Sequence, residues 1–520
     1  MWALPSLSKW VRTSLIGCLS RWPGLRAPRA GEREHGVEDG YHSTVKRRLF
    51  VLFLSATLTC QAPAAGLPDL GDVGAGDLSP LAERRVGEQA MRDIRFREQA
   101  YVEDPEIEDY LNDLGQRLAA HAPETAQSFR FFAVGESTLN AFALPGGFIG
   151  VHTGLITAAK TESELASVLG HEIAHVTQRH IAQLVANQGT TGMIMLASIL
   201  VAILAASRNP QAAEAALATG SAAGIQSQLA YSRDFEREAD RVGLQILQGA
   251  GFDVRGMEAF FERLQRSSRL YENNAPVYMR THPLTTERIS DIGNRVSQMR
   301  YRQVAGSETF HLVRAKLIVD AAPPGVSVEG MHLLDDQAAD VRGYARALVA
   351  LKAGRAEEAR AHVAKLSPEW RQHPMVDFLL GEILRAQRDL NTAVAHFRRA
   401  VAAWPGHRAL AYGLIETLVE LGRHGDAVVE ARSRISGDSD DVRMWSLLSR
   451  AQAGRGSSSG RHRAQAEVFR IQGAWRAAVE QLELARAAGD ADFYEASAID
   501  ARLREFRRQL QLAREPRADG

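Results

Sequence analysis

Residues 167–180 read SVLGHEIAHVTQRH and contain two histidines four positions apart, His171 and His175. Apolar residues recur around them at three- and four-residue spacing, which predicts an amphipathic helix. Thr161 followed by Glu164 fits a capping box at its start. Because four residues make just over one helical turn, both imidazoles should project from one face of this helix.

Two imidazoles on one helix face can hold one Zn²⁺ ion at about 2.1 Å. Glu172 lies beside the first of them, placed to act on a water at the metal without ligating the metal itself. A catalytic zinc needs a third protein ligand and an open position. The second predicted helix, in YSRDFEREADRVGLQIL, offers Glu236 as the natural third ligand. Asp240, one turn further on, can accept the outer N–H of a ligand histidine and fix its tautomer.

The sequence defines the roles of other polar residues less closely. Glu238 points away from the ligand face and is expected to be solvated. His180 follows His175 by five residues, which predicts a helix-surface or structural role, and His152 is expected to hydrogen-bond in the core. His282, in the Pro-containing loop of THPLTTERI, is either a turn histidine or a fourth zinc ligand that would displace the water and silence the enzyme.

Two segments before the helix, 129–135 and 140–156, have strand character because aromatic and β-branched residues are punctuated by Gly and Pro. We therefore expect an α+β zincin-like metallopeptidase domain over residues 67–305, mostly helical with a small sheet. An extended substrate strand is expected to pair with main chain, with little sequence preference. The edge expected to receive it comprises Gly147, Phe148, Ile149, Gly150 and Val151.

From about residue 340 the sequence changes to helices rich in Ala, Arg and Leu, with a visible period. One unit matches the spacing of a tetratricopeptide repeat at Gly381, Leu384, Ala393, Phe397, Ala400 and Pro405. This pattern predicts an all-α tetratricopeptide-repeat solenoid over residues 340–517, after a linker at 306–339. Stacked helix pairs of this kind form a concave binding surface, whereas generic helical packing is the alternative.

The N-terminal region is typical of an export signal. Residues 45–64 combine a basic run, a short apolar stretch and an A-x-A cleavage pattern, which predicts a secretory signal peptide. We then expect residues 1–44 to be a mis-assigned extension, with translation beginning at Val45. Cys60 raises a lipoprotein alternative, although Thr59 and Thr57 make a poor lipidation box.

Composition excludes some classes of function and of site. Lys plus Arg and Asp plus Glu both total 62, so nothing in the net charge favours a nucleic acid as partner. The two cysteines, Cys18 and Cys60, precede the folded part, which excludes a disulfide framework and leaves His, Asp and Glu as metal ligands. The apolar segment 192–206 is short for a transmembrane helix, so it is a buried helix or a segment that touches the membrane peripherally.

The motifs HEIAH, SRDFEREAD and THPLTTERI occur in one order, after NAFALPGGFIGVHTGLI and a signal sequence and before a repeat tail. In this combination the chain resembles the β-barrel assembly-enhancing proteases, which are periplasmic zinc metallopeptidases of Gram-negative bacteria. The resemblance runs from Leu67 to the C-terminus. It implies the zinc ligands His171, His175 and Glu236, the general base Glu172, a regulatory histidine at His282 and an active-site arginine at Arg288.

The same resemblance implies a function in the periplasm. Such a zinc endopeptidase would degrade unfolded or misassembled outer-membrane β-barrel proteins and, through its repeat domain, assist their assembly together with the barrel-insertion machinery. The alternative is mainly a non-proteolytic chaperone or scaffold, with the peptidase site kept mostly shut by His282.

Overall fold

The computed structural model of the protein describes residues 78–124, 127–188, 233–270, 277–300, 302 and 304–513. The predicted N-terminal extension, the signal peptide, both cysteines and the apolar segment 192–206 lie outside these residues. Within the described ranges, no helix has both the length and the apolar character needed to cross a membrane.

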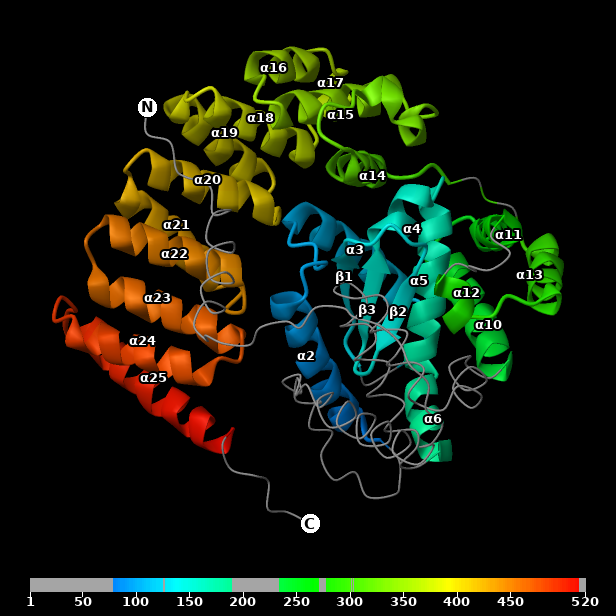
Figure 1. Ribbon diagram of the computed structural model, residues 1–520, viewed down its shortest axis with the longest axis horizontal. Helices are drawn as coiled ribbons and strands as arrows, with labels where there is room; N and C mark the ends of the chain where they lie inside the picture. The colour runs from blue at the N-terminus through cyan, green and yellow to red at the C-terminus, as the bar shows by residue number, and fades with distance from the viewer. Residues whose placement is uncertain are drawn as a thin grey trace, which may run out of the picture. The chain divides into compact units, whose positions relative to one another are not determined.

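The first part of the described chain is mostly helical with a small sheet, as expected for an α+β peptidase domain (Figure 1). Its elements are α2 (Pro80–Arg97), α3 (Pro105–Ala119), β1 (Arg130–Val134), β2 (Ala141–Leu144), β3 (Phe148–His152), α4 (Thr153–Ala158), α5 (Glu162–Thr177), α6 (His180–Gln188), α10 (Arg233–Gly249), α11 (Arg255–Leu270), α12 (Val277–Thr281) and α13 (Thr286–Gln298). Helix α5 packs against α3, α10, α11 and strand β2, so it lies at the centre of this part.

The three strands form one sheet in the order β1-β3-β2. Strand β3 pairs in parallel with β1 and in antiparallel with β2, so both of its edges are hydrogen-bonded. The expectation that residues 147–151 offer an open edge is therefore wrong, because these residues lie in the middle of the sheet or in the turn before it. The edge beside α5 belongs to β2.

Helix α5 begins where the sequence predicts. The Thr161 hydroxyl accepts the Glu164 N–H at 3.2 Å, and the Glu164 carboxylate reaches back to the Lys160 N–H at 3.0 Å. Every residue from Glu162 to Val176 is buried. A helix buried on all sides can present polar side chains only to a partner inside the protein, so its two histidines and Glu172 need such a partner.

Helix α10 approaches α5 closely because glycines face one another. A Cβ atom on Gly243 would lie 3.0 Å from the backbone nitrogen of His171, and one on Gly170 would lie 3.2 Å from the Gly243 carbonyl oxygen. The absence of side chains at this crossing lets the two helix backbones come together. Acidic residues of α10 can thereby reach the histidines of α5.

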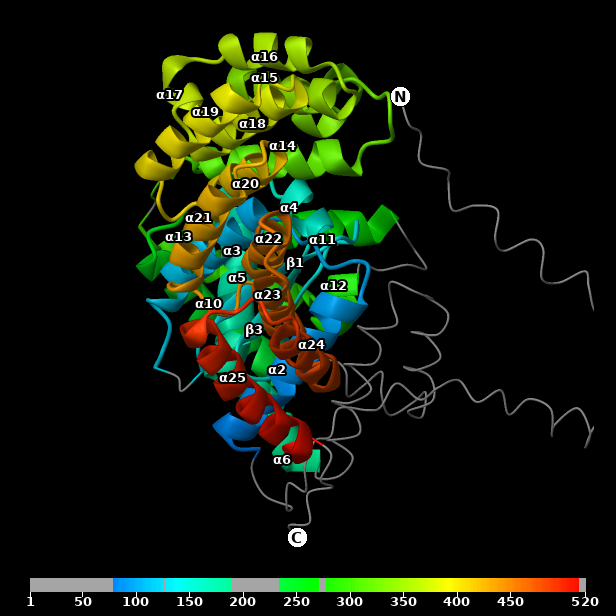
Figure 2. The ribbon, with the colours of Figure 1, turned by 90° about the vertical axis from the view of Figure 1, so that its left-hand side faces the viewer.

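The second part is all-helical and confirms the predicted repeats (Figure 2). Its helices are α15 (Ala339–Lys352), α16 (Ala356–Ala364), α17 (Pro368–Arg371), α18 (Pro374–Ala386), α19 (Leu390–Ala403), α20 (Arg408–Glu420), α21 (His424–Ile435), α22 (Val442–Gly454), α23 (Ser458–Ile471), α24 (Trp475–Ala487) and α25 (Phe493–Leu512). The Phe397 ring occupies the space that Cβ atoms on Gly381 and Gly413 would fill, at 2.2 and 2.5 Å. Glycine at these positions is thus a packing requirement of the repeat.

Residues 306–339, expected as a linker, contain helix α14 (Glu308–Ala321) and two short 3₁₀ turns, η1 (Val328–Gly330) and η2 (His332–Leu334). Helix α14 packs against α3 and α4 on one side and α15 on the other. Most of its side chains are buried. The segment between the two parts is thus an ordered helix with its own core contacts.

Candidate metal centre

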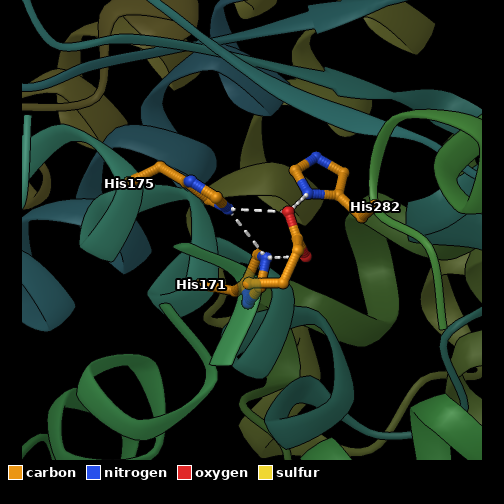
Figure 3. Close-up of side chains that lie close together, drawn as sticks. His171, His175 and His282 are labelled. Carbon is orange, nitrogen blue, oxygen red and sulfur yellow. Dashed lines mark hydrogen bonds and ion pairs between the residues drawn. The ribbon is translucent and has the colours of Figure 1, made fainter. Parts of the chain in front are cut away.

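Three histidines and one glutamate converge in the peptidase part (Figure 3). His171 and His175 come from α5, Glu236 from α10 and His282 from the loop that follows α12. All four side chains are buried, and each offers one ligand atom within 4.8 Å of the others. The structure therefore brings together the three ligands that the sequence predicts and His282, the possible fourth.

The spacing of these atoms fits a tetrahedral zinc site, whose ligand atoms lie about 3.3 Å apart when each bond is about 2.0–2.1 Å. The Nε2 atoms of His171 and His175 are 3.0 Å apart, and each lies 3.5 Å from a Glu236 oxygen. The His282 Nδ1 atom is 3.0 Å from Glu236 Oε1. Two imidazoles with one carboxylate are a donor set of catalytic zinc sites, which keep the fourth position for water.

Glu172 lies next to this group. Its Oε1 atom is buried without a hydrogen bond from a described residue and lies 3.6 Å from His282 Nε2. Burial raises the pKa of Glu172, while His282, His171 and a backbone hydrogen bond from Ala143 act in the opposite direction. A buried carboxylate oxygen with no donor is costly, so this atom fits a neighbouring cation or a bound water.

Asp240 and Arg288 support the first ligand. Asp240 Oδ1 lies 3.1 Å from His171 Nδ1. Arg288 donates to both oxygens of Asp240 at 2.6 and 2.7 Å, and its Nη1 lies 2.8 Å from Glu236 Oε2. The same guanidinium donates to the Pro283 carbonyl at 2.8 Å, which holds the loop that carries His282. These contacts agree with the predicted positions of Asp240 and Arg288 and orient two ligands at once.

Buried charges set the protonation of the group. Burial lowers the pKa of His171, but Asp240 and Glu236 outweigh it and raise this pKa to about 9. Burial and the neighbouring His171 hold the pKa of His175 well below its usual range. Although burial opposes it, His282 and His171 keep the pKa of Glu236 well below its usual range. The carboxylate of Glu236 and a neutral His175 are the forms that bind a metal.

His180 has the structural one of its two expected roles and not the helix-surface one. It is fully buried, and its Nδ1 is 2.8 Å from Nδ1 of His175. Its Nε2 lies 3.4 Å from a carboxylate oxygen of Glu238, which is only partly solvated. The reason is a break between α5 and α6 at Arg179, whose φ is +55°. No residue type in this stretch signals that break.

His152 forms a hydrogen bond, as the sequence predicts, but at a partly exposed position and not in the core. Its Nδ1 lies 2.7 Å from the Thr138 hydroxyl, and burial lowers its pKa to about 4. It is not a member of the group of potential metal ligands.

Comparisons with known proteins agree with both parts of the chain. Residues 105–296 match the model of peptidase family M48, and residues 344–407 and 384–451 match tetratricopeptide-repeat models. The chain is 32% identical over 480 residues to the β-barrel assembly-enhancing protease of Escherichia coli K12, covering 90% of this chain and 97% of that protein. A protein of the same name from Yersinia pestis is 31% identical over 457 residues, covering 85% and 92%. The mitochondrial metalloendopeptidase OMA1 of Bos taurus is 32% identical over 167 residues, covering 31% of each chain.

Proposed function

Since the chain belongs to the family of β-barrel assembly-enhancing proteases and is a metalloendopeptidase, we propose that it cleaves unfolded or misassembled outer-membrane β-barrel proteins in the periplasm. We further propose that its repeat domain binds these clients or the barrel-insertion machinery and thereby assists assembly. The observation that carries the proposal is the convergence of His171, His175 and Glu236 beside the buried Glu172.

The proposed metal is one Zn²⁺ ion per chain, held by His171, His175 and Glu236. When bound, it would act as a Lewis acid that polarises the scissile carbonyl and lowers the pKa of water. Glu172 is the proposed general base, because it is buried, adjacent to the ligands and carries an oxygen that receives no hydrogen bond from the described part of the chain. It takes a proton from water and passes it to the leaving amine. A raised pKa suits this exchange, because an effective base has a pKa near the working pH.

The proposed substrate edge is β2 and not residues 147–151. Strand β2 pairs only with β3 among the described residues and packs against α5, which carries Glu172. An extended peptide added to this edge would be held by main-chain hydrogen bonds, with little dependence on its sequence. This mode of recognition suits a β-strand that has failed to enter a barrel.

Cleavage of a purified, urea-unfolded outer-membrane barrel protein tests the proposal. Glu172→Gln should reduce the cleavage rate by a factor on the order of 100 or more while zinc content stays at one per chain. Glu262→Gln, which changes an exposed carboxylate on α11, is the matched control and should cleave like the parent. Unchanged cleavage by Glu172→Gln would refute the assignment of the base.

His282 is proposed to regulate the site as a fourth ligand. It contacts Glu236 at 3.0 Å and lies 3.6 Å from Glu172, so its ring stands between the proposed ligand and the proposed base. In that position it would compete with water. His282→Ala should therefore cleave faster than the parent at equal zinc occupancy. A slower rate would mean that His282 supports catalysis instead of restraining it.

A second candidate function is a chaperone or scaffold that works without proteolysis. The long, closely packed repeat array and the presence of His282 inside the site favour this candidate. A deletion strain complemented with Glu172→Gln separates the two functions. Restored outer-membrane assembly would support the scaffold, whereas accumulation of misassembled protein would support proteolysis.

A further inference from the structure

His180 is a fully buried histidine whose ring contacts a proposed metal ligand from the outside. Its Nδ1 lies 2.8 Å from Nδ1 of His175, and its Nε2 lies 3.4 Å from Glu238 Oε2. The Nε2 of His175 faces the other way, toward His171 and Glu236. The three side chains thus form a line from the metal centre to a carboxylate that is 37% exposed.

When His175 ligates a metal, the rings of His175 and His180 can form this line of hydrogen bonds in only one arrangement of protons. A histidine that ligates a metal through Nε2 carries its proton on Nδ1, which then acts as a donor. The Nδ1 of His180 must accept that proton, so its own N–H lies on Nε2. This N–H faces the Glu238 carboxylate. Each ring nitrogen then has one role, and none is left without a partner of the right kind.

We propose that His180 is a positioning residue that fixes the ring orientation and tautomer of the metal ligand His175, with Glu238 fixing His180 in turn. The proposal rests on the metallopeptidase function proposed above. Asp240 has the corresponding place at His171, where one carboxylate contacts the outer nitrogen directly. The two ligands of α5 thus have different supports, a carboxylate for one and an imidazole backed by a carboxylate for the other.

The surroundings hold the His180 ring in place before any metal arrives. Phe235 of α10 stacks on it, with ring centroids 4.4 Å apart and an angle of 13° between the planes. The preceding residue, Arg179, adopts a left-handed backbone that is uncommon outside glycine. Its guanidinium contacts Glu83 at 2.6 Å and the Leu78 carbonyl at 2.5 Å, which ties this turn to the start of α2. A preoriented support of this kind loses less freedom when the ligand binds.

A pair of substitutions separates the hydrogen bond from the packing. His180→Phe keeps an aromatic ring against Phe235 but removes both nitrogens. His180→Asn keeps an acceptor, because the asparagine side-chain oxygen takes the place of Nδ1. Zinc affinity of the full-length protein, measured by competition between Zn²⁺ and a chelator, should fall about 10- to 100-fold in His180→Phe. It should stay within about threefold of the parent in His180→Asn.

Kinetics provide a second measurement with the same proteins. Cleavage by His180→Phe at saturating zinc should show a lower kcat and an unchanged KM, because the substrate edge is not touched. His396→Phe is the matched control, since it places the same ring at a buried histidine of the repeat helix α19. It should leave zinc affinity unchanged, whatever it does to the stability of the repeats.

Each outcome decides the proposal. Equal affinity in the parent and His180→Phe overturns it, and so do equal losses in His180→Phe and His180→Asn, because packing alone would then explain the effect. If His180→Phe does not fold, His180→Ala replaces it in the comparison with His180→Asn. A parent protein that binds no zinc would instead overturn the proposed function, so the two failures are distinguishable.

Discussion

The metal centre and the N-terminal end of α3 both bury carboxylates, but they surround them with different partners. In the metal centre, Glu172 and Glu236 lie among imidazoles, and Glu172 keeps an oxygen without a hydrogen bond from a described residue. At α3, Asp104 and Glu106 both contact the ammonium group of Lys316, at 2.5 and 2.6 Å. In the metal centre one cation of the chain, Arg288, contacts Glu236, and imidazoles make the other contacts, whereas at α3 lysine and arginine make them.

The acids on α3 lie where the peptidase and repeat parts meet. Lys316 comes from α14, and Arg408, at the start of α20, contacts Glu108 at 3.1 Å and Asp109 at 2.6 Å. We call this group the α3 charge cluster, and its members are Asp104, Glu106, Glu108, Asp109, Lys316 and Arg408. Three elements that are distant in the sequence are thus joined by paired charges.

The difference shows how buried acids can be assigned to structure or to chemistry. A carboxylate paired with lysine or arginine already has its counter-charge, and removing one partner mainly destabilises the fold. Glu236 and Asp240 share one guanidinium, Arg288, so this group of acids can take further counter-charge from a metal, because the imidazoles beside it are metal donors. The predictions below test whether the two regions are as separate as this comparison requires.

The largest effect on stability is expected at Lys316. Lys316→Met removes the cation that two carboxylates share, and an uncompensated buried charge costs about 3–5 kcal/mol. Lys352→Met is the matched control, because Lys352 and its partner Asp320 are both half-exposed and such pairs contribute no more than about 1 kcal/mol. Urea unfolding measures both variants. Similar losses in the two would mean that the α3 charge cluster has no special role.

Zinc should stabilise the protein by the next largest amount. Free Zn²⁺ at 100 times its dissociation constant should raise the free energy of unfolding by about 2.7 kcal/mol. Glu236→Gln should lose most of this gain because it lacks the charged ligand, whereas Lys316→Met should keep it. Thermal unfolding with and without zinc measures the difference. A gain of equal size in Glu236→Gln would contradict the proposed ligand set.

A smaller change is expected at Asp240, which contacts His171 and is not one of the proposed ligands. Asp240→Asn keeps an oxygen near His171 but removes the charge that Arg288 contacts at two atoms. Zinc affinity should fall about 10- to 100-fold. Asp234→Asn, on the exposed side of the same helix, should leave the affinity unchanged in the same chelator competition. An unaltered affinity in Asp240→Asn would remove this residue from the site.

Much of the site follows from local geometry, and this explains why it could be predicted. His171 and His175 share a helix face because four residues make about one turn, and that relation holds in any helix. The paired spacing of Glu236 and Asp240 is fixed in the same way. Which helix meets which is a tertiary fact, but the requirement for a third ligand left Glu236 as the natural choice.

The parts that the sequence leaves open or places wrongly concern relations that spacing does not encode. Spacing leaves His180 with either a helix-surface or a structural role, and the turn of the chain at Arg179 selects the buried, structural one. The sequence predicts a substrate edge at residues 147–151, within a stretch of strand character. Strand order decides which edge is open, and β3 lies between β1 and β2 although it follows both in the sequence.

The most gradual effect concerns the pH dependence of the α3 charge cluster. Burial raises the pKa of Glu106 to about 7, from 4.5 in an unperturbed glutamate, although Lys316 acts in the opposite direction. Between these values the folded protein holds a proton that the unfolded chain has released. The contribution of Glu106 to stability is therefore complete below pH 4.5 and falls as pH rises through about 7, by at most about 1.4 kcal/mol per pH unit.

Glu106→Gln should remove this fall, because glutamine does not titrate. His407 lies 3.7 Å from Glu106, and burial lowers its pKa to about 4, so its own contribution rises with pH over the same range. The difference between the variant and the parent, measured by urea unfolding at pH 5, 6 and 7, isolates Glu106. The stability of Glu106→Gln relative to the parent should increase at each step to higher pH. If the difference in the free energy of unfolding between the two proteins is the same at all three pH values, Glu106 is ionised throughout this range. Contact with Lys316 would then offset the effect of burial on the pKa of Glu106.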